Sequence, residues 1–330
     1  MVLADTVSVI VVTFNSAQVI EECLRSVLDA ESAPNIIIVD NASTDGTLAI
    51  VGRVAPKAVV LRNDLNVGFA RAVNRGVSKA ANPYILLLNP DALISGWDVS
   101  RLVDFFDERA DVGVAAPLMI EAGGAHPTIA AGMSPSLWRM FTHSTGLSRF
   151  GTRWRRLAGH YVFASQMRTS SDHEVDWVSG GCLFTRKRLW DDLGGLDERW
   201  FMYAEDVDYC IRVRETGSRC VVVGTVPASH AVGMSSASSE ASPAVRTVWI
   251  ENLFDLYMYR LAPSSAHAWL WKHIVSLGFD ARAFVASARG QEGDRVRFRA
   301  YSSALRSVRL LRPARRGSAP SRPRTPWRAP

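Results

Sequence analysis

The sequence predicts an α/β protein built on a doubly wound sheet. Three observations lead to this fold class. Short runs of β-branched and aliphatic residues alternate with helical patterns over the first ninety or so of 330 residues. The runs are apolar throughout, as in strands that are buried on both faces. Polar clusters follow three of these runs, where parallel sheets bind their ligands.

The elements follow one another in regular order along the first part of the chain. The strands are expected at Val7–Phe14, Ile36–Asp40, Ala58–Leu61 and Tyr84–Leu88. Between them, helical patterns are expected at Ala17–Leu28, from about Thr44, and at Gly68–Ala81.

The three polar clusters are Thr13–Asn15, Asp40–Gly46 and Asn89–Asp91. The fingerprints GxGxxG and GxxxxGK[ST] are absent, which argues against a simple NAD or ATP site. Asp40 can accept a hydrogen bond from a base or ribose, although the same cluster also fits a helix N-cap. Asp91 could offer oxygen to a hard cation, or could serve the turn that Pro90 begins.

A second conspicuous stretch runs from Trp177 to Arg212, with two Gly-Gly pairs and the acidic cluster Glu205-Asp206-Val207-Asp208. Acidic residues at a helix start are favoured by the helix dipole, and this is one interpretation of the cluster. The other is a sugar site, in which exposed aromatic side chains form a wall for the ring. The aromatic candidates are Trp177, Trp200, Phe201 and Tyr203.

Taken together, these motifs resemble the family 2 glycosyltransferases with a GT-A fold. The resemblance rests on VSVIVVTFN, VDNASTDGT, NVGFARAVNRG, NPDA and the stretch from Trp177 to Arg212, and it covers about Val7 to Ser235. Within that family the chain is most similar to bacterial L-rhamnosyltransferases that act on N-acetylglucosaminyl-diphospho-polyprenol. The resemblance implies a Rossmann-like mixed sheet of the GT-A type.

The resemblance also implies a nucleotide-sugar site at the strand ends. It comprises Thr13, Phe14, Asn15, Asp40, Asn41, Gly68, Phe69, Asn74, Asn89 and Asp91. Asp91 matches the last acid of the family's DxD metal motif, and Asn89 replaces the first acid. His230 matches a residue that can complete the shell of a divalent cation, Mg²⁺ or Mn²⁺, although a lone His is more often structural.

On the acceptor side, the resemblance implies that Asp206 is the catalytic base. Trp177, Gly180, Gly181 and Glu205 match residues that surround the acceptor.

Composition bounds the remaining features. Cys23, Cys182, Cys210 and Cys220 form no close pair and are expected to be free thiols. We expect no signal peptide, since the first residues lack a basic region, and no apolar run is long enough to span a bilayer. Residues 291–330 hold eleven Arg and two acids and so carry +9; because the whole chain carries +6, residues 1–290 carry −3.

The expected domains are residues 1–235 for the catalytic domain, 236–290 for a C-terminal helical appendage and 291–330 for a basic disordered tail. Residues 122–174, rich in Arg and Trp, are either an excursion near the acceptor or a surface insertion. The Trp-containing helices expected at 245–261 and 266–279 either lie in a membrane interface or pack on the catalytic domain. The basic tail either binds a polyanion or is merely solvated.

The sequence therefore predicts an inverting glycosyltransferase at the inner face of the cell membrane. We expect a nucleoside diphosphate sugar as donor, with dTDP-L-rhamnose the preferred one, and a lipid-linked saccharide as acceptor; no nucleic-acid partner is expected. Alternatives are another donor sugar, such as galactofuranose, mannose or glucose, or a catalytically silent protein that binds sugar nucleotides or acts as a membrane scaffold. A nucleotidyltransferase would require a Gly-rich, basic loop after the first strand, which the chain lacks.

Overall fold

The computed structural model describes residues 3–30, 33–120, 129–151, 153–163, 167, 171–230 and 243–310. The chain divides into two compact units. The sheet unit comprises Met1–Gly132, Phe163–Phe201 and Glu205–Glu240, and the helical unit comprises Met133–Val162, Met202–Ala204 and Ala241–Pro330.

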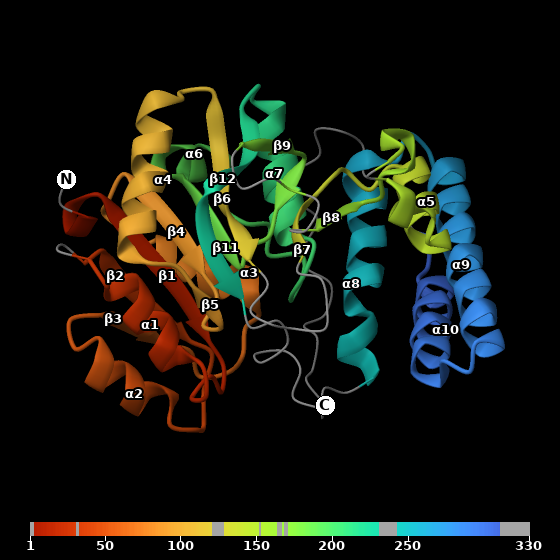
Figure 1. The fold of residues 1–330 in the computed structure, drawn as a ribbon. Coiled ribbons are helices and arrows are strands. Elements are labelled where there is room, and N and C mark those ends of the chain that lie inside the picture. The colour runs from red at the N-terminus through yellow and green to blue at the C-terminus, as the bar shows by residue number, and fades with distance from the viewer. Residues whose placement is uncertain are drawn as a thin grey trace. The chain divides into compact units, whose positions relative to one another are not determined.

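The sheet unit is built on a mixed sheet whose main path runs β3-β2-β1-β4-β11-β6-β12-β5 (Figure 1). Strands β1, β2, β3 and β4 are parallel, whereas β11 runs antiparallel to both β4 and β6. The strands in chain order are β1 (Val7–Thr13), β2 (Asn35–Asp40), β3 (Val59–Arg62), β4 (Tyr84–Leu88), β5 (Ala92–Leu93), β6 (Val112–Ile120), β7 (Ile129–Gly132), β9 (His173–Val175), β10 (Trp177–Val178), β11 (Cys182–Arg186) and β12 (Arg219–His230). The four predicted strands are confirmed to within two residues.

The helices of the sheet unit lie on both faces of this sheet (Figure 1). They are α1 (Ile20–Leu28), α2 (Thr47–Val54), α3 (Phe69–Val77), α4 (Gly96–Glu108), α6 (Lys187–Leu193) and α7 (Glu205–Glu215), with a short 3₁₀ turn at Leu3–Asp5. Because helices cover both faces, β1 and β4 are buried almost throughout, which explains their continuous apolar sequences.

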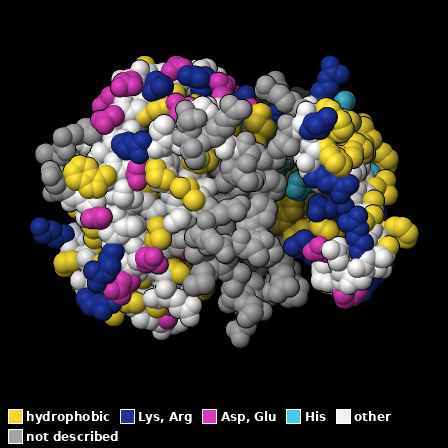
Figure 2. Space-filling view, in the orientation of Figure 1, with side chains coloured by type: hydrophobic (Ala, Val, Ile, Leu, Met, Phe, Trp, Pro, Cys, Tyr) yellow, Lys and Arg dark blue, Asp and Glu magenta, His cyan; other side chains and the backbone are white. Residues whose placement is uncertain are grey.

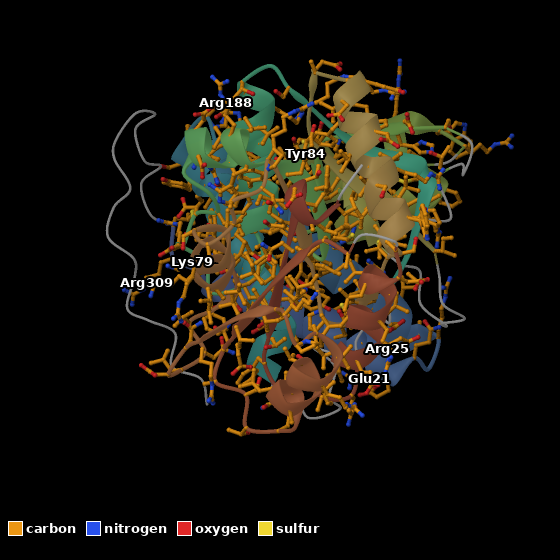
Figure 3. All side chains as sticks on the ribbon, turned by 90° about the vertical axis from the view of Figure 1, so that its left-hand side faces the viewer. Glu21, Arg25, Lys79, Tyr84, Arg188 and Arg309 are labelled. Atoms are coloured by element: carbon orange, nitrogen blue, oxygen red, sulfur yellow. The ribbon has the colours of Figure 1, made fainter. Side chains whose placement is uncertain are left out.

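Packing rather than surface charge holds the helices to the sheet. In α1, Cys23 and Leu24 are fully buried in the core. On its outer face Arg25 pairs with Glu21 at 2.9 Å, as the two labelled side chains in Figure 3 show. An exposed pair of this kind contributes only a few tenths of a kcal/mol, about 0.3 to 0.5. Burial of the apolar face therefore fixes α1, and with it the loop that follows β1.

The helical unit contains α5 (Leu137–Thr145), α8 (Pro243–Leu256), the π-helical turn Tyr257–Leu261, α9 (Ser265–Ala288) and α10 (Glu292–Ser307). It also holds two 3₁₀ turns, Leu147–Phe150 and Arg155–Leu157, and the short strand β8 (Tyr161–Phe163) begins in it. Its core is aromatic: Phe254 and Tyr257 stack on Trp271, with ring centroids 5.3 Å apart in both pairs. In the parts of the chain that the structure describes, no helix is both long and apolar enough to cross a membrane.

Two expected domain bounds need correction. Residues 292–307, predicted to belong to a disordered tail, form α10, because Phe298 and Leu305 are buried in the helical unit. Residues 133–162, expected within the catalytic domain 1–235, belong to the same unit as the C-terminal helices. The predicted linker around residue 235 and the end of the tail lie outside the described residues. The four cysteines are free, as predicted, and all four are buried.

Candidate active site

The loops after β1 and β2 are tied to each other by side-chain hydrogen bonds. Thr13 donates to Oδ1 of Asp40 at 2.9 Å, and the backbone N–H of Ser43 donates to Oδ2 of Asp40 at 3.0 Å. Oδ1 of Asn15 accepts from the backbone N–H of Thr44 at 2.8 Å. Asp40 and Thr13 are fully buried, so Asp40 shapes this loop pair and is not an exposed acceptor.

Two predicted residues lie differently at this edge. The Phe14 side chain is 48% exposed and offers a flat apolar face at the end of β1. Asn41 is buried: its amide donates to the carbonyl of Gly68 at 3.4 Å and accepts from Asn63 at 2.7 Å. Asn41 therefore connects the second strand end to the loop before α3.

The start of α3 requires glycine at position 68. Gly68 has φ of 89°, and a Cβ there would lie 2.5 Å from the carbonyl oxygen of Phe201. That same carbonyl accepts the backbone N–H of Phe69 at 2.8 Å. The close approach seats the first turn of α3 against the segment that leads toward α7.

Asn74, listed with the predicted nucleotide-sugar site, connects α3 to a distant turn through both ends of its side chain. Its amide nitrogen donates to the carbonyl of Leu196 at 2.9 Å and to Glu198 at 3.1 Å. Its amide oxygen accepts the N–H of Leu196 at 3.0 Å. Both ends of the side chain thus hold α3 to the turn after Gly195.

The predicted base and the predicted acceptor glycines lie together. The backbone N–H of Gly180 donates to Oδ2 of Asp206 at 3.0 Å, and the N–H of Val207 donates to Oδ1 at 2.8 Å. A Cβ at Gly180 would stand 3.0 Å from the Phe69 ring and 3.7 Å from Cβ of Asp206. The Gly-Gly pair therefore lets the backbone approach Asp206 and Phe69 closely.

The second glycine of this pair reaches the third strand-end cluster. The carbonyl of Gly181 accepts the backbone N–H of Asn89 at 2.8 Å. Two residues further along lies Asp91, which is buried. Ala92, the next residue, pairs with His230 in the register of β5 and β12. The backbones of Asp91 and His230 are thus neighbours; the His230 side chain lies outside what the structure describes.

Burial sets the electrostatics of Asp206. Desolvation raises its pKa above the ordinary aspartate value, and the hydrogen bonds from Gly180 and Val207 counteract part of that rise. Asp206 itself is partly exposed, whereas the neighbouring acids Glu205 and Asp208 are buried. Asp208 pairs with Arg212 at 2.8 Å. Arg212 also donates to the carbonyls of Leu193 and Gly195, so Asp208 belongs to a structural network.

The backbone just before α7 is strained. Tyr203 and Ala204 have φ values of 68° and 75°, a region that residues with a side chain rarely adopt. Strain of this kind persists where the surrounding structure imposes it, and it gathers at functional sites. The sequence offered no signal for it, because neither residue is a glycine.

The predicted aromatic wall is partly wrong. Trp177 is only 4% exposed, and Trp200 is buried to the same degree. A Cβ at Gly132, which pairs with Trp177 across β7 and β10, would lie 2.1 Å from the Trp177 ring. Trp177 therefore fills a gap over Gly132 and cannot line a sugar site with its face. Phe201 and Tyr203 are partly exposed.

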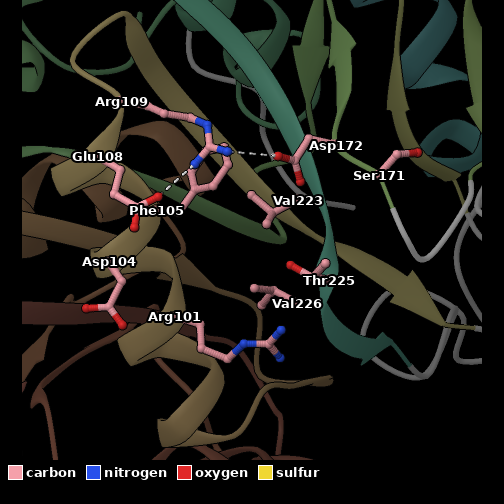
Figure 4. A pocket seen from close by; sticks show the side chains of 10 residues that line it. All are labelled: Arg101, Asp104, Phe105, Glu108, Arg109, Ser171, Asp172, Val223, Thr225 and Val226. Atoms are coloured by element: carbon pink, nitrogen blue, oxygen red, sulfur yellow. Dashed lines mark hydrogen bonds and ion pairs between the residues drawn. The ribbon is translucent and has the colours of Figure 1, made fainter.

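A separate cavity of about 370 Å³ opens between α4 and β12 (Figure 4). Arg109 spans one side of it, 3.4 Å from Glu108 and 3.7 Å from Asp172. Val223 and Val226 of β12 contribute apolar lining. No residue of the predicted site lines this cavity, so it is not the candidate active site.

Comparison with known proteins agrees with this geometry. Residues 8–167 match the model of glycosyl transferase family 2. The chain is 29% identical over 253 residues to the N-acetylglucosaminyl-diphospho-decaprenol L-rhamnosyltransferase of Mycobacterium tuberculosis, covering 73% of this chain and 80% of the relative. It is 39% identical over 171 residues to rhamnosyltransferase WbbL of Escherichia coli, covering 52% and 58%.

Solved structures show the same fold at lower sequence identity. The mannosyltransferase PcManGT of Pyrobaculum calidifontis, in complex with GDP-Man and Mn²⁺, gives a TM-score of 0.55 at 17% identity over 91% of this chain and 84% of that one. TarS of S. aureus gives 0.50 at 15% identity, over 92% and 90%. These neighbours confirm the predicted GT-A fold.

Proposed function

Since this chain is a family 2 glycosyltransferase with a GT-A fold, we propose that it transfers L-rhamnose from dTDP-L-rhamnose to a hydroxyl of a lipid-linked saccharide. Two relatives are rhamnosyltransferases by name, and that of M. tuberculosis acts on N-acetylglucosaminyl-diphospho-decaprenol. The transfer inverts the configuration at the anomeric carbon. The observation that carries the proposal is Asp206, a partly buried carboxylate that accepts the backbone N–H of Gly180 and has a raised pKa.

Asp206 acts as the general base. It takes the proton of the acceptor hydroxyl as the oxygen attacks the anomeric carbon from the face opposite the nucleotide. A carboxylate with a raised pKa is a stronger base than an ordinary aspartate once it is ionised. The hydrogen bond from the backbone N–H of Gly180 orients the Asp206 carboxylate. The carboxylate is therefore in position before the acceptor binds.

The strand-end loops hold the nucleotide. Phe14 offers an exposed ring on which the base can stack, while Thr13, Asp40 and Asn41 fix the loops that shape the pocket. The first turn of α3 carries the partial positive charge of a helix N-terminus, which suits the diphosphate. The N–H groups of Gly68 and Phe69 are already bonded to Asn66 and Phe201, so the diphosphate would meet the later N–H groups of this turn.

The residues near Asp91 fit a divalent cation that arrives with the donor. Among the described residues no group of three His, Cys, Asp or Glu side chains forms a metal cage. Mg²⁺ commonly uses one or two carboxylates and completes its shell with substrate phosphates, and Asp91 beside His230 matches that pattern. Asp91 and His230 would hold the cation, which when bound neutralises the departing diphosphate.

A lipid-linked acceptor also places the reaction at a membrane surface. We therefore propose that the chain works at the cytoplasmic face of the cell membrane, as a peripheral protein.

A nucleotide-sugar panel tests the donor and the cation together. Thermal shift and transfer to a soluble acceptor are measured with dTDP-L-rhamnose, UDP-galactofuranose, GDP-mannose and UDP-glucose, each with Mg²⁺, Mn²⁺ or chelator. We expect the largest shift and measurable transfer with dTDP-L-rhamnose, and loss of both in chelator. Asp91→Asn should weaken donor binding by about tenfold or more, and His230→Ala should weaken it less.

Three outcomes contradict parts of this proposal. Preference for another sugar nucleotide would overturn the donor but leave the enzyme class intact. Donor binding that is unchanged by chelator and by both substitutions would show that the cation site is wrong. Binding of the donor without any transfer or hydrolysis would favour a catalytically silent protein.

A further inference from the structure

Helix α9 exposes an apolar strip along much of its length. Leu277 is 61% exposed and Phe284 76% exposed, and Trp269, Leu270 and Val285 are exposed as well. Leu270, Leu277 and Phe284 recur every seven residues, about two helical turns, so they lie on one side. From Trp269 to Val285 the strip is about 24 Å long at 1.5 Å per residue.

The opposite side of α9 is already used by the fold. Trp271, Val275 and Phe279 are buried in the helical unit. Trp271 donates to the carbonyl of Pro135 at 2.9 Å, and the buried Lys272 ammonium donates to the carbonyls of Arg306 and Val308. Asp280, three residues after Leu277 and four before Phe284, is 37% exposed and is paired with Arg306 of α10. The exposed residues Trp269, Leu270, Leu277, Phe284 and Val285 are all apolar, and an apolar helix face of this extent marks an interaction surface.

Exposed aromatic and basic side chains also occur on the segment that packs beside α9. Helix α5 touches α9 so closely that a Cβ at Gly278 would lie 2.2 Å from Oγ of Ser144. In and after α5, Trp138, Phe150 and Trp154 are exposed. Figure 2 shows hydrophobic side chains at the outer edge of the helical unit, beside a column of Lys and Arg.

The arginines here are placed over aromatic rings. Arg149 lies over Phe150, with its guanidinium carbon 4.7 Å from the ring centroid, and Arg153 lies over Trp154 at 5.9 Å. Such pairs combine an apolar body with a positive tip, which suits a boundary between hydrocarbon and charged headgroups. Residues 133–162 hold five Arg and no acid.

The net positive charge of the helical unit indicates which kind of partner its exposed face binds. Together, residues 133–162 and 243–310 carry fifteen basic and five acidic side chains. A second copy of the chain would bring the same positive surface to this face and be repelled. An anionic bilayer offers the opposite charge together with an apolar layer that can receive the strip.

We propose that the exposed face of α9, with the aromatic and arginine side chains of residues 138–154, lies in the headgroup region of an anionic membrane. The helix lies parallel to the bilayer plane, with Leu270, Leu277 and Phe284 directed into it. This membrane contact rests on the proposed function, because a lipid-linked acceptor lies in a membrane. It adds to that function the surface of the protein that touches the bilayer.

Vesicle co-sedimentation with a double variant tests this assignment. The full chain and Leu277→Asp/Phe284→Asp are compared on vesicles of phosphatidylcholine with phosphatidylglycerol, at low and high salt. Both positions are exposed, so the variant should keep its helical circular dichroism and its melting temperature. We expect the variant to lose about tenfold or more in vesicle affinity at both salt levels, because carboxylates replace side chains that enter the apolar layer.

A matched control uses another exposed aromatic residue on a helix. Trp97, in the first turn of α4 in the sheet unit, is 55% exposed. Trp97→Asp should leave vesicle binding within about twofold, since a carboxylate is tolerated at a helix start. Hydrogen exchange of the unaltered chain should also show slower exchange in α9 when vesicles are added.

The assignment is overturned if the double variant binds vesicles as well as the unaltered chain, or if α9 gains no protection. It is also overturned if light scattering shows a dimer that the double variant abolishes. Transfer to a soluble acceptor is measured in parallel. If the double variant loses vesicle binding but the unaltered chain transfers no rhamnose, only the proposed function is contradicted. If the unaltered chain transfers rhamnose but the double variant binds vesicles as well as it does, only the α9 assignment is contradicted.

Discussion

At the scale of single residues, the acidic cluster at the start of α7 separates into different roles. Asp206 accepts hydrogen bonds from the backbone N–H groups of Gly180 and Val207. Asp208, two residues later, is held by the guanidinium of Arg212. A carboxylate bound to a cation is a poor base, whereas one that is desolvated and bound to amides retains basicity. The surroundings, and not the residue types, thus single out Asp206.

We predict that Asp206→Asn reduces transfer by about a hundredfold to ten-thousandfold while donor affinity stays near that of the unaltered chain. The amide keeps the shape of the side chain but cannot accept the proton. Rates and donor affinity measured by calorimetry check this. As a control, Asp208→Asn should lower the free energy of unfolding by about 3 kcal/mol, because Arg212 is left buried without its partner charge. If the Asp206→Asn variant transfers at a rate within threefold of the unaltered chain, another residue must be the base.

The same residue predicts how the rate depends on pH. Because burial raises the pKa of Asp206, the base becomes ionised only above the pH at which an ordinary aspartate is ionised. The rate of transfer should therefore rise with pH through a limb that lies above the ordinary aspartate range, and flatten once Asp206 is ionised. If the rate of transfer stays constant as the pH is lowered to the ordinary aspartate pKa, the pKa of Asp206 is not raised.

At the scale of secondary-structure elements, α5 is joined to the helical core through His143. Its ring packs edge-on against Tyr161 with centroids 5.0 Å apart, and near Trp249 and Phe279 at 6.3 Å. Burial, with the nearby positive charge of Arg282, lowers the pKa of His143 to about 3. The folded unit therefore holds a neutral imidazole over the whole physiological range.

This predicts an acid-sensitive helical unit. In the unfolded chain His143 binds a proton with an ordinary pKa of about 6.5, whereas the folded unit resists protonation down to about pH 3. Stability is therefore full above about pH 6.5 and falls as the pH decreases through the interval between the two values. Melting curves across that interval check it. The His143→Gln variant has no titrating group at this position, so its melting temperature should fall less as the pH decreases. If the melting temperatures of both proteins fall equally with pH, His143 is not the cause.

At the scale of the whole molecule, charge is distributed unequally between the units. The segments of the helical unit carry three basic residues for each acidic one, whereas the chain as a whole carries 38 basic and 32 acidic residues. Residues 311–330 add six Arg and no acid. Because α10 ends at Ser307, a truncation that removes the basic end without damaging the helical unit must begin after it.

We predict that deleting residues 311–330 weakens binding to anionic vesicles at low salt and has little effect at high salt. Each Arg near an anionic surface contributes about 1 kcal/mol, and salt screens that attraction beyond about 8 to 10 Å. Catalysis on a short soluble acceptor should be unchanged. Co-sedimentation at the two salt levels and a transfer assay make the comparison, with deletion of residues 291–330 as the control that also removes α10 and should lower the melting temperature. Equal sedimentation of the full and shortened chains at low salt would leave these residues without a role in adhesion.

The sequence by itself determined the positions of β1 to β4 and the strand ends at which the candidate site is built. These follow from local patterns: the apolar runs of β1 and β4 are typical of strands covered on both faces, and polar turn residues follow where the strands stop. The GT-A fold, and Gly68, Gly180 and Gly181 as candidate site residues, followed from the resemblance to family 2 glycosyltransferases, and each of these glycines lies at a close approach to other groups.

Only the tertiary structure decided what each of those residues does. Trp177 was predicted to face a sugar and is instead buried over Gly132, because its partner strand β7 lies 45 residues earlier in the chain. Asn74 was predicted as part of the nucleotide-sugar site, and its side chain holds Leu196, 122 residues away. The roles of Asp206 and Asp208, and the merger of residues 133–162 with the C-terminal helices, depend likewise on which distant groups come into contact. Local sequence fixes an element and its faces, whereas burial and hydrogen-bond partners are set by segments far along the chain, and these decide whether a side chain meets a ligand or the protein itself.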